Sequence, residues 1–150
     1  MARQKGFIEE NVYEEAKKRI HHIYDTHDNV NIAYSGGKDS TVILNLVWEV
    51  AQERGLDSID AHHRDEELNP GLILDNVKYY FDQPWCNMTW YALPKNGSFF
   101  CLGVTKQITY WDPSGEREWL RPKPEWAETL NDRTEVLGRH GYDQIITDTY

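Results

Sequence analysis

The chain has 150 residues, of which 39% are hydrophobic and 27% charged, and this length predicts one domain. No apolar run approaches the roughly 20 residues of a membrane-spanning helix, which excludes a transmembrane protein. Its formal net charge of −9 disfavours non-specific adhesion to nucleic acid, and two cysteines, Cys86 and Cys101, are too few for a disulfide framework. The N-terminus leads into Glu9, Glu10 and Asn11 instead of an apolar stretch, so we expect no secretory signal and a cytoplasmic location.

The first third of the chain predicts a helix, a short strand and a second helix. Asn11 followed by Glu14 has the pattern of a capping box, and apolar residues recur behind it at helical spacing, which predicts an amphipathic helix over 12–25. Residues 30–34 predict a short strand. A glycine-containing turn and a new helical apolar pattern follow, so we expect a second helix that ends at Gly55.

The alternation of strand and helix continues through the middle of the chain. Residues 58–63 predict a second strand, and 87–93 a third. Between them, Asn69 followed by Pro70 predicts a helix N-cap with proline at the first helical position. Because strands that alternate with helices usually run parallel, we expect an α/β fold whose mostly parallel sheet has helices on both faces.

The pattern becomes irregular and rich in tryptophan over 94–124. Asp112-Pro-Ser-Gly115 predicts a turn, and the Tyr-Trp and Trp-Leu dipeptides on its two sides predict short strands, so we expect a hairpin or an ordered loop. Beyond it, residues 125–139 predict a helix and residues 143–147 a last strand.

The glycine-containing loop after the first predicted strand carries the sharpest chemical signal. Two glycines allow a tight turn whose backbone N–H groups can approach a phosphate, and the helix that follows directs its unpaired amides at the same anion. Lys38 adds a positive charge, and because Asp39 would repel a phosphate, we expect a Mg²⁺ ion held jointly by this carboxylate and the phosphates. A simple glycine turn capped by polar residues is the alternative. The expected nucleotide-binding residues here are Tyr34, Ser35, Gly36, Gly37, Lys38, Asp39, Ser40 and Thr41.

Six consecutive residues, Ser-Gly-Gly-Lys-Asp-Ser at 35–40, resemble the PP-loop of the ATP pyrophosphatase superfamily, which includes the phosphoadenosine phosphosulfate (PAPS) reductase family. The loop lacks the GxxxxGK[ST] spacing of the common nucleoside triphosphatases. The tryptophans, prolines and basic residues between 85 and 124 look like the aromatic insert of PAPS reductase-like proteins of phages and mobile elements. The resemblance extends over residues 28–124.

The resemblance implies a single domain over residues 1–150 with a Rossmann-like fold of the adenine nucleotide alpha-hydrolase-like type. This fold is a three-layer sandwich with a mostly parallel sheet, here with an aromatic-rich insert. Family members carry an arginine-containing segment after the fourth strand, at about the point where this chain reaches Tyr150. We therefore expect either a shortened version of the family fold or a site completed by another subunit, for instance in a homo-oligomer.

The resemblance also implies an enzyme that binds ATP or a related adenine nucleotide with Mg²⁺ and acts at the α-phosphate. The expected reaction is adenylyl transfer with release of pyrophosphate, as in sulfur-transfer pathways. Lys38 and Asp39 are the expected catalytic residues, with Asp39 as the metal ligand. Asp65 and Glu66, in an acidic segment after the second strand, are expected beside the nucleotide, with a solvated loop as the alternative.

Two other functions stay open on the sequence. A sulfonucleotide (PAPS) reductase would use Cys86 or Cys101, although neither lies in the family's Glu-Cys-Gly context and a core thiol is the alternative. A non-catalytic nucleotide-binding or assembly module is the second.

Residues 95–123 have a positive excess, with five basic against three acidic residues. Arg117, Trp119, Arg121 and Lys123 could stack on and neutralise a nucleic acid such as tRNA or DNA, and a sulfur-donor protein is another expected partner. A folded insert with a small tryptophan core is the alternative.

Adjacent histidines lie at the end of the second predicted strand. Neighbouring side chains on a strand point to opposite faces. We therefore expect one of His62 and His63 to be buried and the other exposed, in preference to a metal site.

Overall fold

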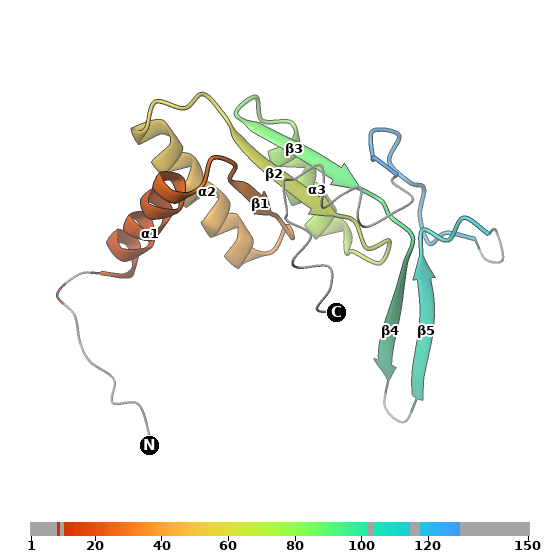
Figure 1. Cartoon of the computed structure of the whole chain (residues 1–150). Coiled ribbons are helices and arrows are strands. Elements are labelled where there is room, and N and C mark those ends of the chain that lie inside the picture. The colour runs from red at the N-terminus through yellow and green to blue at the C-terminus, as the bar shows by residue number, and fades with distance from the viewer. Residues whose placement is uncertain (1–8, 10, 102–103, 115–117, 130–150) are drawn as a thin grey trace, which may run out of the picture.

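The computed structural model of the chain describes residues 9, 11–101, 104–114 and 118–129, with the backbone alone at 98–101 and 104–106. Three strands, β1 (Asn31–Ala33), β2 (Ile59–Arg64) and β3 (Cys86–Tyr91), form a parallel sheet in the order β1-β2-β3. The structure therefore confirms the α/β class and the parallel sheet (Figure 1).

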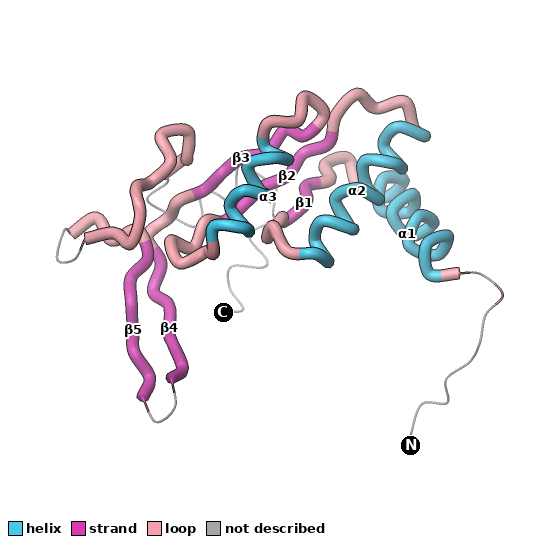
Figure 2. The backbone as a smooth tube through the Cα atoms, turned by 180° about the vertical axis from the view of Figure 1, so that it is seen from behind, coloured by secondary structure: helices cyan, strands magenta, loops and turns pink. Residues whose placement is uncertain are grey.

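Two helices connect the strands, α2 (Lys38–Glu53) between β1 and β2 and α3 (Gly71–Phe81) between β2 and β3. Right-handed connections between strands in sequential order place both helices on one face of the sheet. Figures 1 and 2, seen from opposite sides, show this arrangement. Among the described elements a helix layer on the opposite face is not present, so the expected three-layer arrangement is not seen in this part of the chain.

The core lies between the sheet and these two helices. Along β2 the side chains of Ile59, Ala61 and His63 are buried, while Asp60 and Arg64 are exposed. Successive strand residues point to opposite faces, so the buried set is the one that faces the helices. His63 is thus the buried histidine of the adjacent pair, and His62 is half-buried.

The first helix, α1 (Val12–Thr26), packs against α2. The Asn11 side chain accepts the N–H of Glu14 at 2.9 Å, as the capping pattern predicts. Ile20 reaches the core, and the Lys17 ammonium lies 3.0 Å from the Glu49 carboxylate on α2. None of the described helices is both long and apolar enough to cross a lipid bilayer.

The predicted start of α3 is wrong by one residue. The N-cap is Pro70, whose carbonyl accepts the N–H groups of Ile73 and Leu74 at 2.9 and 3.2 Å. The N–H of Asn69 instead donates to the Glu66 carbonyl in a turn. Because Asn69 belongs to this turn, its side chain does not cap α3, and the helix begins one residue later than predicted.

The irregular segment contains an antiparallel hairpin, but at other residues than those predicted. Strands β4 (Lys95–Cys101) and β5 (Val104–Tyr110) pair with Lys95 opposite Tyr110, and they extend away from the parallel sheet (Figures 1 and 2). Because β5 ends at Tyr110, the predicted turn at 112–115 follows the hairpin and does not connect its strands. Trp119 and Leu120 form no strand.

The predicted helix over 125–139 is contradicted where the structure describes it. Residues 125–129 form a turn and then a parallel bridge between Tyr91 and Glu128. The N–H of Glu128 donates to the Trp90 carbonyl at 2.8 Å, and the N–H of Ala92 donates to the Glu128 carbonyl at 3.0 Å. The segment is extended because it satisfies polar groups along β3. Residues 130–139 and the predicted strand at 143–147 lie outside the described residues.

Asn11 before α1 and Asn69 before α3 allow the two helix N-termini to be compared by mutation. Replacing the capping Asn11 with Ala is expected to lower the free energy of unfolding by about 1 kcal/mol, because a helix donor loses its acceptor. Asn69→Ala is expected to cost less than half of that, since no side-chain cap bond is made at α3. Urea denaturation of both variants measures the difference, and a larger loss for Asn69→Ala would contradict the assigned N-cap.

Candidate functional site

The glycine loop lies where β1 ends and α2 begins. The N–H of Tyr34 donates to the His62 carbonyl at 2.8 Å, so the backbone stays beside β2 one residue past β1. The chain then turns at Gly36, with φ of +79°, and enters α2 at Lys38. The loop therefore lies at the carboxyl edge of the parallel sheet, where α/β proteins bind their ligands.

Helix α3 presses against the loop from the side. A Cβ at Gly36 would lie 2.7 Å from Val77 Cγ2, 2.9 Å from Ile73 Cγ2 and 3.0 Å from the Ile73 carbonyl oxygen. No side chain fits into this space, and the positive φ independently favours glycine. Gly36 thus serves close packing as well as the turn.

Short hydrogen bonds within the motif fix the shape of the loop. The Ser35 and Ser40 hydroxyls lie 2.9 Å apart, and the Ser40 hydroxyl also donates to the Gly37 carbonyl at 3.0 Å. The Gly37 N–H lies 3.3 Å from Ser35 Oγ. The two serines consequently join the two ends of the turn.

The side chain of Asn76 on α3 also holds the glycine loop. This residue was not identified from the sequence. Its side-chain nitrogen lies 2.8 Å from the Gly36 carbonyl, 3.0 Å from the Tyr34 hydroxyl and 3.1 Å from the Thr41 hydroxyl. An asparagine inside a helix has low intrinsic propensity, which is the sequence signal that could have pointed to it. Because Asn76 binds the carbonyl of Gly36, it fixes the orientation of the following peptide.

The first turn of α2 is open to solvent. Its N-cap, Gly37, makes no side-chain cap bond, in contrast to Asn11 at α1. The first N–H groups of a helix have no acceptor within the helix and carry a partial positive charge, so this terminus can hold an anion. Lys38 and Asp39 are both exposed there. All eight predicted loop residues, 34–41, are thus brought together in one place.

Asp39 meets part of the requirement for a magnesium ligand. Mg²⁺ is usually bound through one or two carboxylates together with substrate phosphates and water. An exposed carboxylate in the first turn fits that mode of binding, and Asp39 would be the residue that holds the ion. Among the described residues there is no group of three or more histidine, cysteine, aspartate or glutamate side chains that could hold a metal without such a ligand.

The acidic segment after β2 separates into two kinds of carboxylate. Asp65 is buried, accepts the Trp90 indole N–H at 2.9 Å and pairs with the Arg121 guanidinium. Glu67 is buried as well and accepts the backbone N–H groups of Trp111 and Leu120 at 2.7 and 2.6 Å. These two carboxylates attach the segment after β5 to the carboxyl edge of the sheet.

Glu66 differs from its two neighbours because it is partly exposed and binds cations. Its carboxylate lies 2.6 Å from the Arg64 guanidinium and 3.5 Å from the Lys95 ammonium. The predicted nucleotide-binding pair, Asp65 and Glu66, therefore has one member enclosed by the protein and one at the surface.

The predicted substrate-binding residues surround two tryptophans. Trp111 is fully buried and meets Trp119 edge-on, with ring centroids 5.6 Å apart. The Arg121 guanidinium lies over Trp111, and the Lys123 ammonium lies 4.7 Å from the Trp119 centroid. Arg117 lies outside the described residues.

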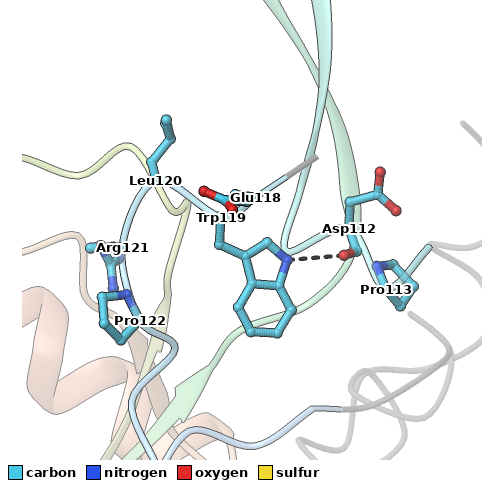
Figure 3. Close-up of a pocket in the computed structure, with 7 residues that line it drawn as sticks. All are labelled: Asp112, Pro113, Glu118, Trp119, Leu120, Arg121 and Pro122. Carbon is cyan, nitrogen blue, oxygen red and sulfur yellow. Dashed lines mark hydrogen bonds between the residues drawn. The ribbon is translucent and has the colours of Figure 1, made fainter. Parts of the chain in front are cut away.

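Trp119 borders an open hollow, which Figure 3 shows. Its indole N–H donates to the Asp112 carbonyl at 2.9 Å, and 39% of the residue is exposed. Burial lowers the pKa of Lys123, which the charge of Glu67 partly offsets. The hollow is lined by Asp112, Pro113, Glu118, Trp119, Leu120, Arg121 and Pro122.

Cys86 is a buried thiol. It lies at the start of β3 in the core, and burial raises its pKa to about 11. Because a thiolate is the reactive form of cysteine, this environment disfavours nucleophilic chemistry at Cys86. The side chain of Cys101 lies outside the described part of the chain.

Comparisons of the chain with models of protein families, with curated proteins and with solved structures find no match. The fold and the site define a class on geometry alone. The chain is an α/β protein that carries a glycine loop between the first strand of a parallel sheet and a helix whose N-cap, Gly37, makes no side-chain hydrogen bond.

Two glycines with positive φ allow the packing at the loop to be tested. Gly36→Ala is expected to lower the free energy of unfolding by about 2 to 4 kcal/mol, through backbone strain and overpacking against α3. Gly55→Ala has the same strain, with φ of +74° but nothing within 4 Å, and is expected to cost about 1 to 2 kcal/mol. Chemical denaturation compares the two, and equal losses would contradict the close contact.

Burial of His63 gives a dependence of stability on pH. The residue is 1% exposed, its Nδ1 lies 2.9 Å from the Tyr34 carbonyl, and burial lowers its pKa from 6.5 despite the nearby Asp65 carboxylate. Protonation therefore favours the unfolded chain. The contribution of neutral His63 to the free energy of unfolding is fully present above about pH 6.5. It is lost as the pH falls toward the folded-state pKa, by at most about 1.4 kcal/mol per pH unit.

Urea denaturation between pH 8 and pH 5 measures this effect. His63→Gln is expected to lose less stability on acidification than the wild-type protein. The control, His22→Gln, replaces an exposed histidine and is expected to follow the wild type. An unchanged pH dependence in His63→Gln would show that His63 does not carry it.

Proposed function

We propose that the protein is a PP-loop enzyme, similar to PAPS reductase-like proteins, that binds ATP or a related adenine nucleotide and acts at its α-phosphate. The observation that carries the proposal is the loop at 35–40, at the carboxyl edge of the sheet. Its turn at Gly36 leads into α2, whose N-terminus has no side-chain cap. This combination provides backbone donors and a helix terminus for a polyphosphate.

The proposed reaction is adenylyl transfer. A nucleophile of the acceptor attacks the α-phosphorus, the bond to the bridging oxygen breaks, and pyrophosphate leaves. The first-turn N–H groups of α2 and the Lys38 ammonium would bind the departing pyrophosphate and neutralise its charge. Asp39 would hold Mg²⁺, which when bound supplies further neutralisation of the phosphates.

The fixed loop supports this role because catalysis by charge stabilisation needs donors that are already oriented. Asn76 and the Ser35–Ser40 pair hold the loop from two sides. The three-layer, Rossmann-like arrangement belongs to the same proposal, as does the assignment of the hairpin and tryptophan segment to the family's aromatic insert.

The acceptor is proposed by class. Trp119 with the Lys123 ammonium over its ring is a surface on which a base of tRNA or DNA could stack. Arg121 is engaged with Asp65 and Trp111, so its role in this proposal is to position Trp111 and not to contact the acceptor.

Calorimetric titration with Mg²⁺ and a non-hydrolysable ATP analogue tests the proposal. Lys38→Ala is expected to weaken binding at least about tenfold, the effect of losing a charged hydrogen bond to phosphate, and to abolish pyrophosphate release. Stability is expected to stay within about 0.5 kcal/mol of the wild type, since Lys38 is exposed.

Lys18→Ala is the matched control, because Lys18 is an exposed lysine on α1, and it is expected to bind the analogue as the wild type does. Absence of binding by the wild-type protein, or equal affinity in Lys38→Ala, would overturn the proposed function. Binding without pyrophosphate release across a panel of acceptors would favour a non-catalytic module.

A further inference from the structure

A buried histidine holds the backbone at the point where the glycine loop begins. His63 Nδ1 lies 2.9 Å from the carbonyl oxygen of Tyr34, the residue that precedes the loop. Because a carbonyl oxygen only accepts hydrogen bonds, Nδ1 carries the proton of the neutral ring and Nε2 carries a lone pair. Nε2 is buried and makes no hydrogen bond within the described part of the chain. The ring thus uses one nitrogen to hold the backbone, while the other is enclosed without a partner.

Tyr34 is fixed at each of its polar groups. Its N–H donates to the His62 carbonyl at 2.8 Å, and its hydroxyl lies 3.0 Å from both the Asn76 side-chain nitrogen and the Thr41 hydroxyl. The bond from His63 fixes its carbonyl, and therefore the plane of the peptide that leads into the loop. The first peptide of the loop is thus oriented by an uncharged imidazole.

The orientation of this peptide is passed on to the donors of the loop. The hydroxyl of Ser35 lies 2.9 Å from the Ser40 hydroxyl and 3.3 Å from the N–H of Gly37. A rotation of the peptide before Ser35 moves this hydroxyl and breaks both contacts. The N–H groups that would bind the proposed polyphosphate follow directly, so their arrangement depends on the bond between His63 and Tyr34.

The surroundings of the His63 ring favour its neutral form. The ring meets the uncharged indole of Trp90 on β3 edge-on, with ring centroids 4.9 Å apart, and burial lowers its pKa. The charged groups that act on it come from β2, the residues that follow it and the segment after β5. The Asp65 carboxylate favours protonation, whereas the guanidinium groups of Arg121 and Arg64 oppose it.

We infer that His63 is a positioning residue for the glycine loop, and that protonation of its ring releases the Tyr34 carbonyl and converts the loop to a form that binds anions weakly. A protonated ring has a donor at Nε2, and a buried donor without an acceptor is costly. The Asp65 carboxylate already accepts the Trp90 indole N–H at 2.9 Å and pairs with the Arg121 guanidinium. The charged ring therefore leaves its position, toward solvent or toward Asp65, and Nδ1 leaves the carbonyl.

The inference rests on the proposed function where it concerns a bound nucleotide, but the change in the loop is a property of the free protein. It predicts that a nucleotide is held at neutral pH and released on acidification, beyond the effect of protonating the phosphates themselves. The apparent affinity falls with the fraction of the protein whose loop is competent to bind. Here that fraction is the one with a neutral His63 ring.

The first part of the test follows the free, ¹⁵N-labelled full chain by NMR from pH 8 down through the titration of the His63 ring. The ring signals give the protonated fraction at each pH, and the amide signals of residues 35–38 report on the loop. In the wild-type protein these amide signals are expected to move with the same midpoint as the ring. In His63→Asn, whose side-chain N–H replaces the Nδ1 donor and does not titrate, they are expected to stay in place.

The second part measures binding of the non-hydrolysable ATP analogue with Mg²⁺ by calorimetry at the same pH values. Where half of the His63 rings are protonated, the dissociation constant of the wild type is expected to have risen about twofold more than that of His63→Asn, relative to pH 8. Protonation of the ligand affects both proteins equally and cancels in this comparison. His63→Leu, which has no donor for the Tyr34 carbonyl, is expected to bind weakly at every pH.

The matched control is His62→Asn. The His62 ring lies on the opposite face of β2 from His63 and contacts the Asn31 side chain, so this variant is expected to follow the wild type in both parts. If His63→Asn does not fold, His63→Gln takes its place, because it does not titrate either.

Loop amide signals that do not follow the His63 titration overturn the inference, as do signals that move equally in His63→Asn. Simultaneous loss of all folded signals at the ring midpoint overturns it as well, because protonation would then unfold the chain and not convert the loop. Absence of analogue binding by the wild type at pH 8 overturns the proposed function instead. The NMR titration of the free protein still decides the inference in that case.

Discussion

The contact between Gly36 and α3 is the constraint on which the site depends. The backbone at Gly36, which has a positive φ, lies against Ile73 and Val77 without room for a methyl group. The side-chain amide of Asn76, on the same helix, donates to the Gly36 carbonyl and so fixes its orientation. Because α3 is itself held by the sheet, the shape of the loop is set by the core and not by the loop sequence alone. A loop held in this way can present its donors without reorganisation when an anion arrives.

The carboxyl edge of the sheet combines an enclosed half and an open half. The enclosed half consists of Asp65 and Glu67, which are buried and bind the tryptophan segment after β5. Removing either carboxylate would leave buried donors without partners. The open half consists of the loop and the Arg64–Glu66–Lys95 cluster, where cations face solvent. The buried acidic residues thus serve the architecture of this edge, whereas its cations are accessible to solvent.

Elements whose formation depends on neighbouring residues could be predicted from the sequence. The capped helix α1, the short strand before the glycine loop and the glycine after α2 follow from propensity, capping and periodicity. The helix predicted from residue 125 failed because backbone pairing along β3 outweighed local preference at Glu128. The roles of Asp65 and Asn76 likewise could not be predicted, since their partners lie 56 and 40 residues away in the chain. Sequence spacing therefore identified the loop but not the residues that hold it.

The central claim, that a polyphosphate binds the glycine loop at the start of α2, is tested most directly by titrating the ¹⁵N-labelled protein with Mg²⁺ and pyrophosphate and following its amide NMR signals. The account predicts that the largest shifts occur at the N–H groups of residues 36–40 and at the side-chain amide of Asn76, which contacts the loop. Shifts confined to other surfaces, with the loop amides unchanged at saturating pyrophosphate, would contradict it.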